Sequence, residues 1–310
     1  MDYNSEFQNA CSNGHLKVAK QLVELYPQIN VSDWDDYAFR YACSNGHLEV
    51  AKWLVESYPQ INIFARNNQA FVGACSNGHL KVAKWLVESY PQIHISTNND
   101  YAFRFACLRG HLEVAKLLVE SYPQINVSTD NSFAFRYACL NGHLEVAKWL
   151  VESYPQINLS AHNDFAFKYA CSNGHLEVAK WLVESYPQII VSADYNFALS
   201  YACEYGHLEV AKWLVELYTQ INITYNNFAF RYACTYSHLK LAKWLVEIRP
   251  YCYVLELDPS QTQILSWRIR PIQETRWLER AVPILAYNSK TPNVFQMLNY
   301  DTMRYICEFV

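Results

Sequence analysis

The hydrophobic and polar positions of this chain follow a pattern that returns every 32 residues. A cysteine marks each return, and only the last interval is shorter, at 31 residues. A fixed period of roughly 20 to 50 residues indicates a stack of similar supersecondary units. The cysteines of the pattern are Cys11, Cys43, Cys75, Cys107, Cys139, Cys171, Cys203 and Cys234.

Each unit has the pattern of two helices that are joined by a glycine and ended by a proline. In the second unit, a first helix is expected at about residues 37–44, because its apolar side chains fall on one face. Gly46 ends that helix, since glycine adopts a left-handed backbone conformation easily. A second, amphipathic helix is expected at about residues 47–57, and Pro59 stops it. The recurring tryptophans, such as Trp53, are predicted to pack between second helices. The side chains predicted to be buried are Ala38, Phe39, Ala42, Cys43, Val50, Ala51, Trp53, Leu54 and Val55.

One such unit cannot bury its apolar surface alone, so stacking against neighbouring units must supply the stability. We therefore predict an all-α helical repeat solenoid of about eight repeats in residues 1–249. Residues 250–310 are predicted to form a helical capping tail. The long surface of such a stack is typical of proteins that bind other proteins.

Charge and cysteine usage exclude several classes of partner. The 310 residues carry 25 lysines and arginines against 29 aspartates and glutamates, a formal net charge of −4, with no basic run. Nucleic-acid binding and docking to an anionic membrane are therefore disfavoured. We expect no membrane-spanning helix and no signal peptide.

The repeat cysteines are badly placed to form disulfides, because stacked helices lie roughly 8–10 Å apart. Reduced thiols in turn indicate the cytoplasm or the nucleus.

Histidines also recur once per repeat, for example His47 four residues after Cys43. A metal ion needs ligands within about 2 Å of it, and side chains a full repeat apart cannot converge. A catalytic pair occurs once per active site, and no phosphate-binding glycine loop or nucleophile elbow is visible. We therefore predict no catalytic residue, no metal and no cofactor. The histidines are interpreted as structural groups that bond loop backbone at the helix junction.

The helix pair resembles the ankyrin repeat. The phrase NGHLEVAKWLVES at Asn45–Ser57 is similar to the second half of that repeat, and edited copies extend the resemblance over residues 3–249. Tyr-Ala-Phe-Arg at residues 37–40 replaces the family's Thr-Pro-Leu-His, and the loop is one residue shorter. These departures put the family's β-hairpin finger in doubt, but not the helix stack. The uniform copies resemble the ankyrin arrays of giant DNA viruses of amoebae. The resemblance implies a non-enzymatic interaction scaffold, which for a viral chain would act in the host cytosol.

The repeats differ mainly in the short polar loops before each first helix. Exposed aromatic side chains in polar loops are common binding anchors. We therefore predict that these loops and the first-helix face bind a protein partner of unknown identity. The alternative is neutral drift in solvated turns. The candidate partner-binding residues are Trp34, Asp35, Asp36, Arg66, Asp100, His162, Asp164, Tyr195 and Tyr225.

A column of basic residues at one position of the first helices has two explanations. A ladder of arginines can receive an acidic partner. We favour the other explanation, in which each one bonds a neighbouring loop carbonyl or carboxylate, because the loops are rich in aspartate. The column consists of Arg40, Arg104, Arg136, Lys168 and Arg231.

The repeat pattern stops after residue 249. The apolar residues of the tail are predicted to cover the exposed end of the last repeat. The stretch LNYDTMRYICEFV at Leu298–Val310 resembles the opening helix of an F-box. This resemblance implies an alternative function, a substrate adaptor that recruits a cullin-type ubiquitin ligase through a Skp-type adaptor. The adaptor-binding candidates are Leu298, Met303, Ile306 and Phe309.

Overall fold

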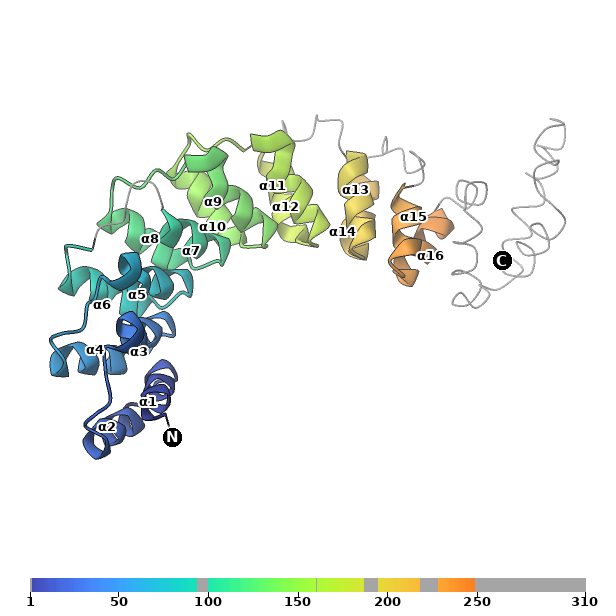
Figure 1. Ribbon diagram of the computed structural model, residues 1–310. Coiled ribbons are helices and arrows are strands. Elements are labelled where there is room, and N and C mark those ends of the chain that lie inside the picture. Colours follow the sequence, from blue (N-terminus) through green and yellow to red (C-terminus); the bar gives the residue numbers. More distant parts are fainter. Residues whose placement is uncertain (1, 94–99, 160, 187–194, 218–227, 249–310) are drawn as a thin grey trace, which may run out of the picture. The chain divides into compact units, whose positions relative to one another are not determined.

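A computed structural model describes residues 2–93, 100–159, 161–186, 195–217 and 228–248. These residues form sixteen α-helices and no strand, which confirms the predicted all-α repeat architecture (Figure 1). The first helices of the pairs are α1 (Tyr3–Ser12), α3 (Asp33–Ser44), α5 (Ala65–Ser76), α7 (Tyr101–Leu108), α9 (Thr129–Leu140), α11 (Ala161–Ser172), α13 (Tyr195–Glu204) and α15 (Phe228–Thr235). The second helices are α2 (Leu16–Leu25), α4 (Leu48–Ser57), α6 (Leu80–Ser89), α8 (Leu112–Ser121), α10 (Leu144–Ser153), α12 (Leu176–Ser185), α14 (Leu208–Leu217) and α16 (Leu239–Ile248).

The chain divides into two compact units. One is Met1–Ala170 with Glu177–Val191, and the other is Cys171–Leu176 with Ser192–Val310. Within the former, the first helices contact one another in chain order from α1 to α9, and the second helices α6 and α8 also touch. Within the latter, α13 contacts α15, and each packs on its own second helix. The predicted capping tail and the predicted boundary at residue 249 lie outside the described residues, so both stay predictions.

The junction between the two helices of a repeat follows from its Asn-Gly-His sequence. After α3, Gly46 has a φ of 83°, which a residue without a Cβ adopts at little cost. The amide of His47 then donates to the carbonyl of Ala42 at 2.8 Å, and that of Gly46 to the carbonyl of Cys43 at 3.1 Å. These two bonds satisfy the last carbonyls of the helix and set the start of α4.

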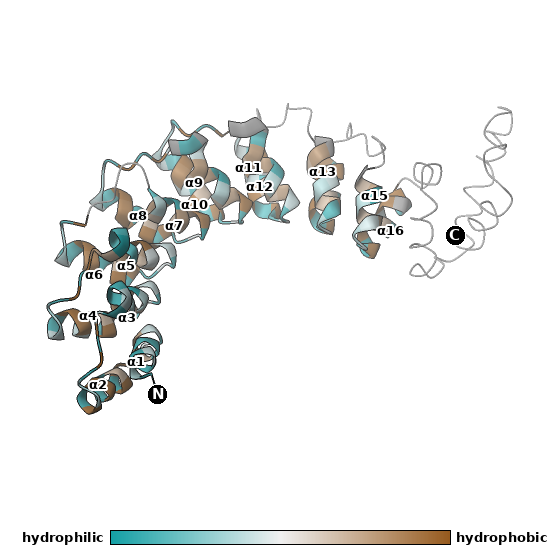
Figure 2. Ribbon diagram, viewed as in Figure 1, coloured by the Kyte–Doolittle hydropathy of each residue, from teal (hydrophilic) through white to brown (hydrophobic). Residues whose placement is uncertain are grey.

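Most of the side chains predicted to be buried are buried, but Trp53 and Val55 are half-buried, and in the first repeat Val18 is exposed. In the second repeat Phe39, Cys43 and Leu54 are fully buried and Val50 is nearly so. Figure 2 shows hydrophobic and hydrophilic residues side by side on the helices, as amphipathic elements require. The eight repeat cysteines are buried free thiols. Burial raises the pKa of all of them, that of Cys11 to about 12. These thiols are therefore small core groups, as predicted.

The histidine of one repeat packs against the glycine of the repeat before it. A Cβ added to Gly46 would lie 2.5 Å from Nδ1 of His79, so the ring occupies the space that a side chain would need. Backbone hydrogen bonds complete the contact: the ring of His79 bonds the backbone of Ser44, and Nε2 of His238 lies 2.7 Å from the carbonyl oxygen of Glu204. The structural interpretation of the histidines is thus confirmed at these positions.

An asparagine side chain adds a second link between repeats. The Nδ2 of Asn45 donates to the carbonyl of Ser12, and that of Asn77 to the carbonyl of Ser44, both at 2.8 Å. Arg109 replaces the asparagine in the fourth repeat and donates to the carbonyl of Ser76 at 3.1 Å. A side-chain hydrogen bond to the carbonyl of the preceding first helix is therefore kept even where arginine replaces asparagine.

The regular part of the first helix begins at Tyr37, as predicted, because the three residues before it have left-handed backbone angles. The segment predicted as a loop in the second repeat is a left-handed turn that leads into the helix, with φ angles of 55°, 56° and 59° at Trp34, Asp35 and Asp36. Residues 66–68 form an equivalent turn. Left-handed geometry costs ordinary residues roughly 1–2 kcal/mol each, so tertiary contacts must hold these turns. The family's β-hairpin finger is absent from the described residues, in line with the departures in sequence.

The tryptophans are placed differently from the prediction. Trp53 is half-buried, and its indole meets the edge of Phe7 on α1 at 6.4 Å and that of Tyr58 at 5.7 Å between ring centroids. Trp149 contacts Phe103 on α7 in the same way at 6.5 Å. These indoles pack on a first helix rather than only between second helices, because the apolar face of a second helix also reaches the first helices beside it.

Candidate binding surface on the turns and first helices

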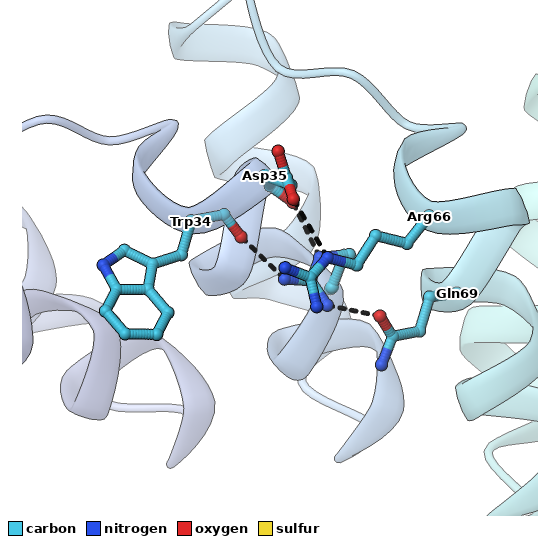
Figure 3. Close-up of polar contacts among 5 residues, drawn as sticks. Trp34, Asp35, Arg66 and Gln69 are labelled. Carbon is cyan, nitrogen blue, oxygen red and sulfur yellow. Dashed lines mark hydrogen bonds and ion pairs between the residues drawn. The ribbon is translucent and has the colours of Figure 1, made fainter.

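The left-handed turns carry the residues that vary between repeats, and Trp34 is the exposed aromatic among them. Its side chain is 70% exposed. Figure 3 shows the indole pointing away from the polar cluster formed by Asp35, Arg66 and Gln69. A large aromatic group that is mostly in water and lies on an otherwise polar turn has the character of a binding anchor.

Arg40 holds the turn that carries Trp34. Its Nε donates to the carbonyl of Asp35 at 2.6 Å, and its second amino group donates to the carbonyl of Trp34 at 2.7 Å. The remaining amino group donates to Oε1 of Gln69 on α5. Arg40 is only 2% exposed, and burial lowers the pKa of its guanidinium. Its donors are aimed at the protein itself, so this arginine fixes the turn instead of receiving an acidic partner.

An ion pair connects two successive turns at the surface. The Nε of Arg66 lies 3.0 Å from a carboxylate oxygen of Asp35, and both side chains are more than half exposed (Figure 3). Exposed pairs of this kind contribute roughly 0.2–1 kcal/mol. The pair therefore aligns the two turns weakly, and a charged group of a partner can replace either member at small cost.

Three of the candidate aspartates lie inside the repeats. Asp36, Asp100 and Asp164 are 5%, 6% and 7% exposed. A carboxylate oxygen of Asp36 accepts the amide of Asn62 at 3.0 Å, and the Asp100 carboxylate bonds the amide of Asn126. Burial raises the pKa of Asp100 despite that bond. The carboxylates of Asp36 and Asp100 thus bond the segment after the second helix, and their placement favours a structural role.

In the fifth repeat, different residues hold the left-handed turn in the same way. Arg136 is buried and donates to the carbonyl of Asp130 at 2.9 Å, as Arg40 does in its own turn. Arg104 from the preceding repeat pairs with the Asp130 carboxylate at 2.9 Å. Ser132 accepts the amide of Asn158 at 3.1 Å and so replaces the buried aspartate. The favoured explanation of the basic column, bonding to loop carbonyls and carboxylates, is thereby confirmed for Arg40, Arg104 and Arg136.

For the remaining residues of the basic column and of the candidate binding sites, the structure gives less detail. Lys168 is buried, whereas Arg231 is exposed. His162 and Tyr195 lie in the first turns of α11 and α13, and their side chains are outside the described part of the structure. Tyr225 and the adaptor-binding candidates Leu298, Met303, Ile306 and Phe309 lie outside the described residues.

A row of aromatic side chains on the first helices was not predicted. On α7, α9 and α11 the pairs occupy equivalent positions four residues apart, which we call the aromatic stripe. The ring centroids are 6.0, 4.0 and 4.1 Å apart within the three pairs, and a further contact of 5.7 Å joins α9 to α11. The sequence shows aromatic residues four positions apart, but this spacing is also that of the apolar face of an amphipathic helix, so it did not reveal the stripe. The stripe consists of Tyr101, Phe105, Phe133, Tyr137, Phe165 and Tyr169.

The polar faces of the second helices neutralise their own charges. Lys116 pairs with Glu113 at 3.0 Å, and Lys212 pairs with Glu209 at the same distance, each three residues apart on one helix. The sequences of the second helices are almost identical in every repeat. A surface that is the same in each repeat offers a partner little specificity, in contrast with the turns.

In the part of the chain that the structure describes, no three His, Cys, Asp or Glu side chains are grouped closely enough to hold a metal ion. Nor is any helix in that part both long and apolar enough to cross a membrane.

Stacked helix pairs with variable turns define a helical repeat protein. The family described as "Ankyrin repeats (3 copies)" matches residues 71–162, 103–193 and 167–254, and "Ankyrin repeats (many copies)" matches residues 7–55. The chain belongs to the ankyrin-repeat family, which confirms the resemblance seen in its sequence. Ankyrin repeats generally mediate protein–protein interactions, and the family is one of non-enzymatic scaffolds.

Among solved structures, the chain is similar to the crystal structure of the human ASB11 ankyrin repeat domain. The two are 20% identical with a TM-score of 0.46, over 57% of this chain and 82% of the other. No curated protein matches the chain.

Proposed function

We propose that this protein is a non-enzymatic scaffold that binds partner proteins through its left-handed turns and its first-helix face. The observation that carries the proposal is the exposed indole of Trp34 on a turn that Arg40 holds by two backbone hydrogen bonds. An anchor that is already fixed in one conformation loses less entropy on binding, so more of its contact energy appears as affinity.

The distribution of sequence variation supports the same surface. The second helices are nearly copied from repeat to repeat, whereas the turns read DWDD at residues 33–36 and ARNNQ at residues 65–69. Because Asp35 and Arg66 form only a weak exposed pair, the turns can exchange it for contacts to a partner. Turns that differ between repeats, on helices that do not, can give the protein specificity for its partners.

The experiment compares two triple variants of the full chain. Trp34→Ala, Asp35→Ala and Arg66→Ala together remove the exposed turn residues, while Glu49→Ala, Glu113→Ala and Glu177→Ala alter the second-helix face as a matched control. Both proteins should keep their helicity by circular dichroism. Quantitative mass spectrometry of captured proteins should show loss of specific partners only for the turn variant. Loss in the glutamate variant alone would assign binding to the other face.

The alternative function, recruitment of a cullin-type ubiquitin ligase, is supported by sequence alone. The resemblance of Leu298–Val310 to the opening helix of an F-box motivates it. Purified Skp-type adaptor should then bind the full-length protein and fail to bind a Leu298→Ala, Ile306→Ala, Phe309→Ala variant that remains folded. If the full-length protein does not bind the adaptor, the alternative is wrong, and the prediction of a capping tail remains.

We also propose the cytoplasm, or the nucleus, as the place of action, and the host cytosol if the uniform repeats reflect a viral origin. The eight buried free thiols support this assignment, since a reducing compartment keeps such groups as thiols. Fluorescence microscopy of the tagged chain in the cells that make it tests the compartment directly.

A further inference from the structure

The aromatic stripe crosses three consecutive repeats of one compact unit and is partly open to solvent. Tyr101 is 46% exposed and Tyr169 is 37% exposed, at opposite ends of the stripe. The rings between them are half-buried. The stripe is therefore a partly exposed row of aromatic side chains and not part of the core.

Arginines fix the middle of the stripe. The guanidinium carbon of Arg104 lies 3.9 Å from the ring centroid of Phe133, and that of Arg136 lies 4.9 Å from the centroid of Phe165. Both arginines also bond Asp130, one through its carboxylate and one through its carbonyl. Cation–π contacts of this kind contribute about 0.5–2 kcal/mol and hold the rings in place, so the stripe is preorganised.

The stripe has a definite beginning. In the third repeat the equivalent positions hold Gln69 and Gly73, so α5 contributes no ring to the stripe. A Cβ on Gly73 would lie 2.0 Å from the side-chain oxygen of Ser44, so a larger residue at that position requires Ser44 to move. The aromatic pair on α3 is thereby separated from the three pairs that start at Tyr101.

We propose that the aromatic stripe binds a proline-rich segment of a partner protein in the polyproline II conformation. This inference rests on the proposed function, because it assigns a ligand class to the first-helix face.

The first argument is spacing. Polyproline II rises about 3.1 Å per residue with three residues per turn, so equivalent residues recur about every 9.3 Å. Stacked helices lie roughly 8–10 Å apart, so one turn of the ligand corresponds to one repeat. A β-strand repeats every two residues, at about 6.6–6.8 Å, and does not keep this register.

The second argument is charge. The first helices and turns of these repeats hold three cationic residues, Arg104, Arg136 and Lys168, against three acidic ones, Asp100, Asp130 and Asp164. Arg104 pairs with Asp130, and Arg136, Lys168, Asp100 and Asp164 are buried. Arg109, which is exposed at the end of α7, adds one positive charge 5.9 Å from the ring centroid of Phe105. The net charge of the stripe is therefore small, which suits an uncharged ligand better than a highly acidic peptide or a nucleic acid.

The third argument is hydrogen bonding. A polyproline II segment makes no internal hydrogen bonds, so its carbonyl groups remain available as acceptors. Each of the three aromatic pairs contains a tyrosine, namely Tyr101, Tyr137 and Tyr169, whose hydroxyl can donate to such a carbonyl. Aromatic rings with one hydroxyl donor in each pair match the groups that a proline-rich ligand presents.

Fluorescence anisotropy with two labelled peptides tests the proposal on the full chain. One peptide carries proline at every third position among alanines, and the other has the same composition with its prolines in adjacent pairs. The regular peptide is expected to bind at least about tenfold more tightly. Equal binding of the two peptides, absence of binding, or displacement of the regular peptide by an oligothymidylate or an acidic peptide would overturn the proposal.

Variants identify the stripe as the binding site. Tyr101→Ala with Tyr169→Ala should weaken binding of the regular peptide at least about tenfold, and Tyr→Phe at both positions should weaken it less, since only the hydroxyls are lost. Tyr37→Ala on α3, outside the stripe, serves as the matched control and should have no effect. Unchanged binding in the alanine variant, with helicity retained, would show that the stripe is not the site.

The peptide result and the test of the turns are separable. If no peptide binds but the turn variant at Trp34, Asp35 and Arg66 loses its partners, this inference is wrong and the proposed function stands. If the regular peptide binds through Tyr101 and Tyr169 while the turn variant keeps its partners, the inference is supported and the role of the turns is wrong.

Discussion

The imidazole of His79 occupies the space beside Gly46 that any side chain on that glycine would need, with Nδ1 2.5 Å from the position of a Cβ. The residue pair belongs to successive repeats, so one contact links the end of α3 to the start of α6. Glycine is required here for two independent reasons: the neighbouring ring, and a φ of 83°. The junction that ends a helix is thus also the contact that aligns the next repeat.

Gly46→Ala should therefore destabilise the protein more than a left-handed alanine alone would. Left-handed geometry costs about 1–2 kcal/mol, and displacement of His79 adds to it, so a loss of roughly 2–4 kcal/mol is expected in urea unfolding. Ser237 provides the matched control. It has a φ of 63° at the equivalent position of the last repeat, where the sequence pattern supplies no further histidine. Ser237→Gly should stabilise by about 1 kcal/mol, and a neutral Gly46→Ala would contradict the account.

Phe135 tests the predicted core. The side chain is completely buried at the centre of α9. Phe135→Ala should lower the free energy of unfolding by about 3–5 kcal/mol, because the site cannot collapse fully around the missing ring. Tyr205, which is 54% exposed, is the control, and its replacement by alanine should cost less than about 1 kcal/mol. Similar losses at both positions would show that burial does not determine the stability of the stack.

The histidine contacts predict lower stability in mild acid. Burial lowers the pKa of His79, His111 and His207 from an ordinary value of 6.5, and for His111 the neighbouring Arg109 acts in the same direction. The unfolded chain therefore binds more protons than the folded chain as the pH falls below about 6.5. Stability should be fully present above that pH and decline toward the lowered pKa values. Urea midpoints at pH 7.5 and 5.5 measure this effect, and His79→Gln should reduce it. Equal or higher stability at pH 5.5 would contradict the prediction.

Arg40 tests the origin of the left-handed turn. Arg40→Met keeps much of the side-chain volume but removes the donors to Trp34 and Asp35. A hydrogen bond that involves a charged group contributes about 1.5–3 kcal/mol net, so a loss of roughly 2–3 kcal/mol is expected. Limited proteolysis should also become faster at residues 33–36. Arg231→Met, at an exposed equivalent position, is the control and should change stability by less than about 0.5 kcal/mol.

The helix stack could be predicted from sequence because local signals determine it. Gly46 ends one helix, Pro59 follows the end of the next, and Phe39 and Cys43 recur at the spacing of one helical face. The left-handed turn could not, since Trp34, Asp35 and Asp36 have no intrinsic preference for that conformation and depend on Arg40 from the following helix. For the same reason Asp36 appeared to be an exposed candidate, although a backbone amide after the second helix draws its carboxylate inside.

Exposure was likewise only partly predictable. Trp34 was proposed as an anchor and is 70% exposed on its turn. The aromatic stripe went unpredicted because Phe133 and Tyr137 have the spacing of a buried helical face. Only the packing of the first helices shows that a different face of the helix, carrying Ala134 and Ala138, is buried.

Site-specific photocrosslinking tests the central claim that partners bind at the turns. A photoreactive phenylalanine analogue is introduced at residue 34 in one full-length protein and at Glu49, on the second-helix face, in another. The account predicts that light joins a specific partner to the protein labelled at residue 34, that prior addition of unlabelled protein abolishes this product, and that the label at residue 49 yields none. A specific product at residue 49 and none at residue 34 would contradict it.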